Sequence, residues 1–332
     1  MSARAVAALL VLLAALTGCE AATGPPPEKA AVVMPIPPGD PYATLARQLQ
    51  QRGVRVWFEA DLVERWLAGP TAFAQGVRRV RRLAALPGVA GVKIADELGY
   101  GDGLGTPARV LAFLRDSRAA LGRHTRVLVD VLVPELGCLA WTGQGSASCG
   151  EQARRDYPAA TEQAVTGYLR SGTVDAVDLS TGLLDPATYA GWGLSPAQAQ
   201  RTAWTRVREL GWDRLTSLRS RKALAAPGGY RGDPRQAAAD VATYVSVPVA
   251  AGARSVDIWT WRQPYDGRTV SLLAGGLTPN PLWVELRAAR RHGAVLFTHM
   301  TPSRLPTGRR RAAELRRAAE VFSAVFVAAG TG

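Results

Sequence analysis

The chain has 332 residues, 47% of them hydrophobic, and its formal net charge at pH 7 is +13. This apolar fraction is typical of a globular protein with a packed core and excludes an intrinsically disordered chain. The basic residues are not interleaved with aromatic ones as on a nucleic-acid surface. We therefore assign the charge to solvated helix faces and expect no nucleic-acid partner.

The chain opens with a charge-free apolar run from Ala5 to Leu16, which follows the basic residue Arg4. This pattern predicts a secretory signal, because the run is too short for a retained membrane-spanning helix. The run closes with Leu16-Thr17-Gly18-Cys19, which resembles the lipobox of bacterial lipoproteins. The resemblance implies that residues 1–18 are removed and that Cys19 becomes the lipidated N-terminus. We therefore expect this lipid to anchor the protein on the extracytoplasmic side of the cell membrane.

Residues 19–30 predict a Pro-rich linker, and residues 31–332 predict one domain in which extended and helical patterns alternate about eight times. The strand patterns are residues 31–36, 54–59, 91–95, 126–133, 174–180, 215–219, 255–261 and 294–298. The helix patterns are residues 41–51, 71–86, 107–121, 158–171, 195–210, 235–251, 281–291 and 309–328.

Strands that alternate with helices predict parallel βαβ units and the α/β class. Eight such units in a chain of this length match a (β/α)8 TIM barrel, which is the predicted fold. The alternative is an open doubly wound sheet, but the Gly-rich phosphate turn of that fold does not follow the first strand.

Two cysteines remain once Cys19 carries the lipid, and both lie in a Gly/Ser-rich loop. Because an exported protein meets an oxidising compartment, we predict a disulfide between Cys138 and Cys149. A metal pair is the alternative, but no histidine lies nearby and the spacing is not Cys-x-x-Cys. We expect neither a metal nor a cofactor.

Several strand patterns alternate apolar residues with charged ones, whereas an ordinary parallel strand is continuously apolar. In residues 54–59, for example, Arg55, Trp57 and Glu59 occupy every second position. The apolar face must meet the helices, so the charged face should point into the barrel. Buried charges are costly unless paired, so we expect an ion-paired network. Its predicted members are Arg55, Glu59, Lys93, Glu97, Asp130, Asp178 and Asp257.

Acidic and aromatic residues gather at the carboxyl ends of the strands, where active sites of this fold are built. The pair Asp96-Glu97 ends one strand and enters a loop with four glycines. Carboxylates supply an acid, base or nucleophile, and aromatic faces stack on pyranose rings, so the combination favours a sugar site. The residues assigned to substrate binding are Asp96, Trp57, Asp178, Arg219, Trp259 and Trp261.

In its architecture and its strand-end acids and tryptophans, the chain resembles secreted (β/α)8 glycoside hydrolases, without the full motif of any one family. The resemblance implies a surface-anchored hydrolase with a carbohydrate or cell-wall glycan as partner. Glu97 is the predicted general acid or base, and Asp130 or Asp257 is its catalytic partner. Two alternatives remain open: a barrel that binds a saccharide without cleaving it, and a structural surface lipoprotein. The sequence does not indicate an oligomeric state.

Overall fold

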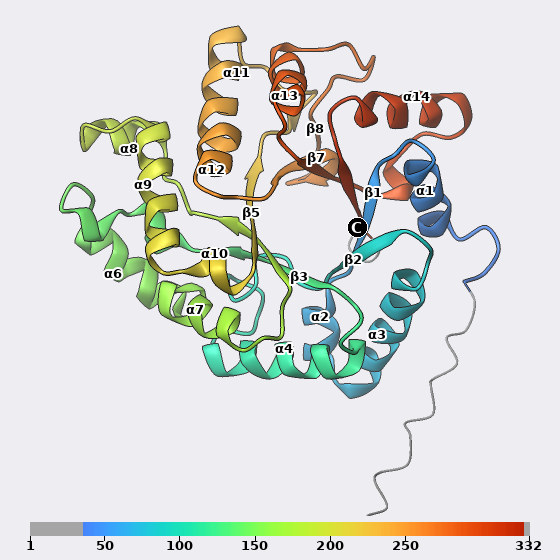
Figure 1. Cartoon of the computed structure of the whole chain (residues 1–332), viewed down its shortest axis with the longest axis horizontal. Helices are drawn as coiled ribbons and strands as arrows, with labels where there is room; N and C mark the ends of the chain where they lie inside the picture. The colour runs from blue at the N-terminus through green and yellow to red at the C-terminus, as the bar shows by residue number, and fades with distance from the viewer. Residues whose placement is uncertain (1–35, 329–332) are drawn as a thin grey trace, which may run out of the picture. The chain divides into compact units, whose positions relative to one another are not determined.

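A computed structural model describes residues 36–328, in which eight parallel strands form a closed barrel surrounded by helices (Figure 1). The strands run round the barrel in the order β5-β4-β3-β2-β1-β10-β9-β7, and β7 pairs with β5 to close it. Their bounds are β1 (Arg55–Glu59), β2 (Val89–Lys93), β3 (Val127–Leu132), β4 (Ala176–Ser180), β5 (Ser217–Ala223), β7 (Val256–Tyr265), β9 (Leu296–Met300) and β10 (Ala324–Ala328). The predicted (β/α)8 barrel is confirmed.

The long helices begin at capping side chains and prolines. Asp40, Thr106 and Asn280 each accept a hydrogen bond from a backbone N–H in the first turn of the helix that follows, and a proline opens each of these helices. The helices are α1 (Pro41–Gln50), α2 (Leu62–Leu67), α3 (Pro70–Ala84), α4 (Pro107–Leu121), α5 (Pro134–Gly137), α6 (Ala147–Asp156), α7 (Glu162–Arg170), α8 (Pro186–Gly191), α9 (Pro196–Glu209), α10 (Trp212–Leu215), α11 (Pro234–Val241), α12 (Val247–Ala250), α13 (Pro281–Arg291) and α14 (Gly308–Ala319). The 3-10 turns are η1 (Ala140–Thr142), η2 (Pro158–Ala160) and η4 (Pro302–Arg304), and η3 (Ala242–Ser246) is π-helical.

The last barrel strand corrects the sequence prediction. The helix expected over 309–328 ends at Ala319, and β10 follows over Ala324–Ala328, where all five residues are buried. A short run that is apolar on both faces cannot be assigned to strand or helix from periodicity alone. The strand expected over 31–36 lies outside the described residues except for Ile36, which is in no strand. β10 therefore completes the barrel beside β1.

A β-hairpin extends from the carboxyl end of β7. The pairing of β7 with β9 shifts register between Ile258 and Arg262, after which β7 pairs antiparallel with β8 (Arg268–Ser271). Asp266 and Gly267 make the turn, both with positive φ, as a two-residue hairpin requires. The short strand β6 (Ala226–Pro227) adds to β8. The hairpin thus stands at the end of the barrel where active sites of this fold are built.

An apolar layer fills the interior of the barrel towards the amino ends of its strands. Trp57 of β1 packs in it against Phe326 of β10, and a β-carbon at Gly91 of β2 would lie only 2.4 Å from the Trp57 ring. Gly91 therefore leaves the space that this ring occupies. We call this layer the buried floor, because the charged groups at the carboxyl ends of the strands lie above it.

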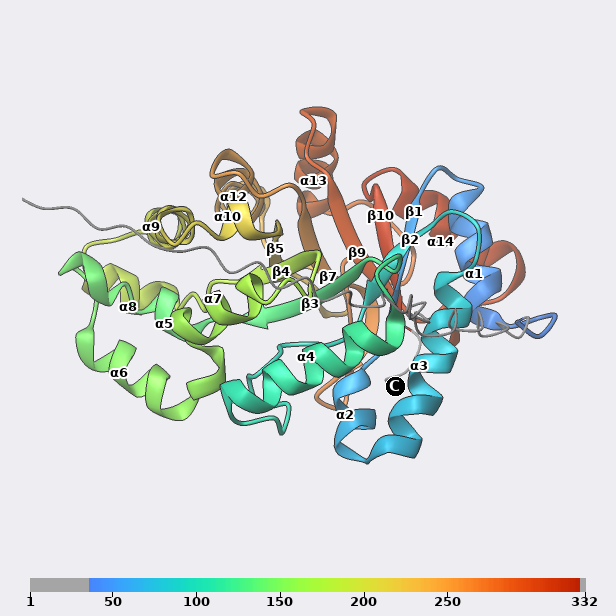
Figure 2. The same ribbon diagram turned by 60° about the horizontal axis from the view of Figure 1, so that its bottom comes forward.

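The helical layer contains the predicted disulfide, between Cys138 at the end of α5 and Cys149 in α6, with their Cα atoms 5.6 Å apart. On the side of the barrel opposite α11 and α13, α2 packs against α3 and lies beside it in both views (Figure 2). No helix within residues 36–328 combines the length and hydropathy needed to cross a membrane. The predicted signal sequence, the predicted lipidation site Cys19 and the predicted linker lie outside the described residues.

Candidate functional site

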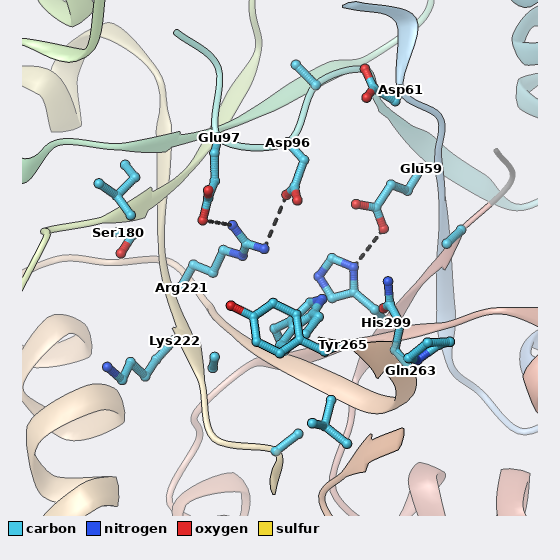
Figure 3. A pocket seen from close by; sticks show the side chains of 18 of the residues that line it. Glu59, Asp61, Asp96, Glu97, Ser180, Arg221, Lys222, Gln263, Tyr265 and His299 are labelled. Atoms are coloured by element: carbon cyan, nitrogen blue, oxygen red, sulfur yellow. Dashed lines mark hydrogen bonds and ion pairs between the residues drawn. The ribbon is translucent and has the colours of Figure 1, made fainter. Parts of the chain in front are cut away.

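A pocket with a volume of about 580 Å³ opens at the carboxyl ends of the barrel strands (Figure 3). Barrel strands provide Glu59, Arg221 and His299, the loop after β2 provides Asp96 and Glu97, and the β7–β8 hairpin provides Gln263 and Tyr265. Side chains from distant parts of the chain meet here because the parallel strands all end on the same side of the barrel.

Lys93 is the central cation on the β1–β3 side of the interior. It is the last residue of β2 and is fully buried, and Glu59 is its register neighbour on β1. Its ammonium lies 2.9 Å from Glu59, 2.9 Å from Asp96 and 3.4 Å from Asp130. Burial opposes the charge of Lys93, but these carboxylates outweigh it and raise the lysine pKa well above its ordinary value. Lys93 is therefore a fixed cation.

Arg221 of β5 reaches four carboxyl groups from the opposite side of the interior. Its guanidinium lies 2.5 Å from Asp130, 3.2 Å from Asp96, 3.5 Å from Glu97 and 3.9 Å from Asp257. A guanidinium has five N–H donors in a planar fork, which allows one side chain to serve several carboxylates. Lys93, which the period-two pattern predicted, and Arg221, which it did not, pair with Glu59, Asp96, Glu97, Asp130 and Asp257. Two predicted members lie outside this network: Arg55 is exposed at the start of β1, and Asp178 lies beside Arg219.

His299 of β9 lies between two carboxylates. Its Nδ1 is 2.6 Å from Glu59, and its Nε2 is 2.7 Å from Asp257. Burial favours the neutral ring, but Asp257 and Glu59 outweigh it and raise the pKa of His299 to about 9. Carboxylates only accept hydrogen bonds, so both ring nitrogens donate and the ring is an imidazolium at neutral pH.

The loop after β2 holds Asp96 and Glu97 in a defined position. The backbone N–H of Leu98 donates to the backbone carbonyl oxygen of Asp130 at 2.8 Å, and the carboxylate of Asp102 accepts from the N–H of Gly99 at 2.7 Å. A β-carbon at Gly99 would lie 2.5 Å from the carbonyl oxygen of Ala159, so only glycine fits there. Glu97 itself has φ 45°, a left-handed conformation that costs energy for a non-glycine residue.

The two neighbouring carboxyl groups differ in acidity. Burial raises the pKa of Glu97, and the opposing attraction of Arg221 does not cancel this effect. Burial also acts on Asp96, but Lys93 and Arg221 outweigh it and hold the pKa of Asp96 well below its ordinary value. The side chains of Asp96 and Glu97 are 50% and 39% exposed, so both reach the solvent of the pocket.

An aromatic wall faces the carboxyl groups. Trp259 of β7 meets Tyr265 of the hairpin edge-on, with ring centroids 5.4 Å apart. In Figure 3 the ring of Tyr265 lies opposite Glu59, Asp96 and Glu97. Lys222 also lines the pocket, but its ammonium lies 4.6 Å from the centre of the Tyr244 ring in the helical layer.

Several predicted substrate-binding residues lie outside the pocket wall. Trp57 belongs to the buried floor, where the guanidinium of Arg219 lies 4.6 Å from the Trp57 ring centre and 4.3 Å from that of Phe297. Asp178 lies beside Arg219 at 4.0 Å and is fully buried. Of the six assigned residues, Asp96 and Trp259 line the pocket.

Trp261 faces the helices, although alternation along β7 predicts that it points inward. Its Nε1 donates to Glu314 of α14 at 2.9 Å, and its ring packs against Trp283 of α13. The cause is the register shift after Ile258, which changes the phase of the alternation. The catalytic candidates Asp130 and Asp257 are fully buried behind the wall, whereas Glu97 lies at the pocket.

The sequence interpretation missed Arg221 and Asp61. It ended the strand expected over 215–219 at Arg219, whereas β5 continues to Ala223, so that Arg221 points inward like Arg219 two positions before it. Period two would have identified Arg221 had the strand been extended. Asp61 lines the pocket but is the N-cap of α2, where its side chain accepts from Val63 and Glu64.

Within residues 36–328, no three or more histidine, cysteine or acidic side chains are arranged to hold a metal ion. No family model matches the sequence, and no curated protein matches it either.

Solved structures resemble the chain at low identity. A candidate phosphonomutase from Burkholderia cenocepacia J2315 is 14% identical over 86% of this chain and 92% of its own, with a TM-score of 0.44. The carboxyl transferase domain of Rhizobium etli pyruvate carboxylase is 13% identical over 87% of this chain and 42% of its own, with a TM-score of 0.46. A 2,3-dimethylmalate lyase of the PEP mutase/isocitrate lyase superfamily is 14% identical over 86% of this chain and 80% of its own, with a TM-score of 0.37. These likenesses extend to the fold alone.

The predicted carbohydrate hydrolase is wrong. Hydrolysis by two carboxyl groups needs both of them free on either side of the scissile bond. Asp130 and Asp257, the expected partners of Glu97, are instead buried against Arg221 and His299. The alternatives of a saccharide-binding barrel and a structural surface lipoprotein find no support either.

Proposed function

We propose that the chain is an enzyme that exchanges a proton with a small polar substrate in the strand-end pocket. Glu97 is the proton-exchanging group, and Asp96 is a permanent negative charge beside it. One observation carries this proposal: the two consecutive carboxyl groups contact the same guanidinium, yet their pKa values move in opposite directions. Two carboxyl groups whose environments separate their pKa values are the usual basis of an acid–base assignment.

The other strand-end carboxyl groups are less suited to proton exchange. Glu59 is held between Lys93 and His299, which outweigh the effect of its burial and lower its pKa to about 2. Asp130 and Asp257 are fully buried and do not line the pocket. Glu97 combines a raised pKa, access to the pocket and a backbone conformation held in place by its loop.

The buried cations have a positioning role in this proposal. Lys93 and Arg221 keep Asp96 ionised. The salt bridges of Lys93 with Asp96, and of Arg221 with Asp96 and Glu97, orient the two carboxyl groups. Because these charges are already in place before a substrate enters, they need little reorganisation during the reaction.

Pooled small molecules in deuterated water test the proposal. The pools contain alkylammonium compounds, neutral amides and esters, and dicarboxylates, and mass spectrometry detects conversion or deuterium uptake. We expect the parent protein to act on at least one pool and Glu97→Gln to reduce that rate by about 10²–10⁴-fold. Glu64→Gln is the matched control, because Glu64 is an exposed carboxylate on α2 outside the pocket lining.

The proposal fails if the parent converts no pool, or if Glu97→Gln keeps the parent rate. Equal losses in Glu97→Gln and Glu64→Gln would also contradict it, because a general loss of charge would then explain the effect.

A further inference from the structure

The interior of the site contains more carboxyl groups than cations. Five carboxyl groups, Glu59, Asp96, Glu97, Asp130 and Asp257, share three cations, Lys93, Arg221 and His299. Two further charges at the pocket, those of Asp61 and Lys222, are opposite in sign and cancel. Full ionisation would leave two negative charges without a partner. Burial raises the pKa of Asp130 well above its ordinary value despite Arg221 and Lys93, so the excess is one charge wherever Asp130 keeps its proton.

The hydrogen bonding of the interior also reflects the excess of carboxyl groups over cations. Asp130 and Asp257 are fully buried, and each has one carboxyl oxygen without a hydrogen-bond partner among the described residues. The cations of the network already have carboxylates around them. An anionic ligand would therefore have to compete with these carboxylates, whereas a cationic ligand would reduce the excess.

The aromatic wall is suited to the same kind of ligand. Tyr265 is 61% exposed and meets Trp259 edge-on, and in Figure 3 its ring lies across the Arg221 guanidinium from Asp96 and Glu97. The face of an aromatic ring attracts cations, and this attraction strengthens when water is excluded. A cavity of about 580 Å³ has the size of a small-molecule site.

We propose that the pocket takes a small organic cation, whose charge lies between the carboxyl groups of Asp96 and Glu97 and the rings of Trp259 and Tyr265. This inference rests on the proposed function and names the substrate class of the same site. The acidic side supplies charge attraction, and the aromatic side supplies a surface for the apolar part of the ligand.

Binding of such a cation should release a proton. The charged and titratable groups facing Glu97 are Arg221 from β5, Lys93 and Asp96 from β2 and its loop, and Tyr100 from the turn that follows. Burial raises the pKa of Glu97, so this carboxyl keeps a proton to a higher pH than an exposed glutamate. A ligand cation beside it favours the carboxylate, and the proton passes to solvent. Affinity should therefore rise with pH until Glu97 is ionised in the free protein.

Titration calorimetry on the full-length protein tests this inference with matched probes. Choline and propylammonium are the cations, 3,3-dimethylbutan-1-ol is the neutral isostere of choline, and malonate is the anion. We expect at least one cation to bind about tenfold or more tightly than the isostere and malonate. Asp96→Asn and Tyr265→Leu should each weaken cation binding severalfold, and Glu64→Gln should leave it unchanged.

Proton release is measured by repeating each titration in two buffers of different protonation enthalpy. In the parent, up to one proton should leave per cation bound near the pKa of Glu97. In Glu97→Gln, the release should vanish, and with it the pH dependence of affinity. Equal binding of choline and its isostere, tighter binding of malonate, or no binding of either cation would overturn the inference.

These outcomes separate the substrate class from the proposed function. If a cation binds as expected but Glu97→Gln keeps full turnover, proton exchange by Glu97 is wrong and the cation site stands. If Glu97→Gln abolishes turnover of an anionic or neutral substrate, proton exchange stands and the cation site is wrong.

Discussion

The ammonium nitrogen of Lys93 lies 2.9 Å from a carboxylate oxygen of Glu59, its register neighbour on the adjacent strand. The lysine side chain is fully buried, and the glutamate side chain is 14% exposed. A buried ion pair contributes little net stability by itself, but removing one partner leaves an uncompensated charge. The network is therefore most sensitive to the loss of a cation, because carboxyl groups are already in excess.

Replacing Lys93 with methionine should lower the free energy of unfolding by about 3–5 kcal/mol, since Glu59, Asp96 and Asp130 lose their shared cation. Urea unfolding at neutral pH measures the change. Lys222→Met is the control, because its ammonium contacts the Tyr244 ring and forms no ion pair within residues 36–328. Losses of similar size in both variants would show that the network has no special role in stability.

The stability of the protein should fall between pH 6.5 and about pH 10 because of His299. Its pKa in the folded protein is about 9, above the ordinary 6.5, so its contribution is complete below pH 6.5 and is lost as the pH rises through 9. A shift of this size corresponds to about 3 kcal/mol. Urea unfolding across this pH range measures the loss, and His299→Gln should remove most of this pH dependence. A parent curve that is flat across the range would contradict the imidazolium assignment.

The disulfide should stabilise the α5–α6 region without affecting the pocket. Cys138 and Cys149 are separated by 11 positions, for which the chain-entropy model gives about 3 kcal/mol. The double variant Cys138→Ser/Cys149→Ser should therefore unfold at lower urea concentration, with unchanged affinity for any ligand of the pocket. Unchanged unfolding of the parent after reduction by dithiothreitol would show that the cross-link contributes nothing.

The sequence predicted the fold well where its signals are sharp. The bounds of α4 and α13 match the predicted residues 107–121 and 281–291, because each helix has a capping side chain followed by proline. The strand β10 escaped prediction because its residues are apolar on both faces. Barrel closure depends on long-range pairing of β10 with β1 and β9, which no local pattern contains.

The candidate site could be predicted only in part. Period-two alternation correctly predicted that Lys93, Asp130 and Asp257 lie in the barrel interior. The pattern could not predict which carboxyl groups would pair with each cation. That pairing depends on distances across the barrel, for example between Arg221 and residues of β3, β7 and the loop after β2. Alternation also failed for Trp261, where a register shift changes the direction of the side chain.

The titration of Asp96 and Glu97 tests the central claim most directly. Carbon-13 NMR of carboxyl-labelled protein gives both midpoints, and difference spectra with Asp96→Asn and Glu97→Gln assign the two signals. We predict a midpoint above the ordinary 4.5 for Glu97 and one below the ordinary 3.8 for Asp96. A Glu97 midpoint at or below 4.5, or an Asp96 midpoint above that of Glu97, would contradict the assignment of Glu97 as the proton-exchanging group.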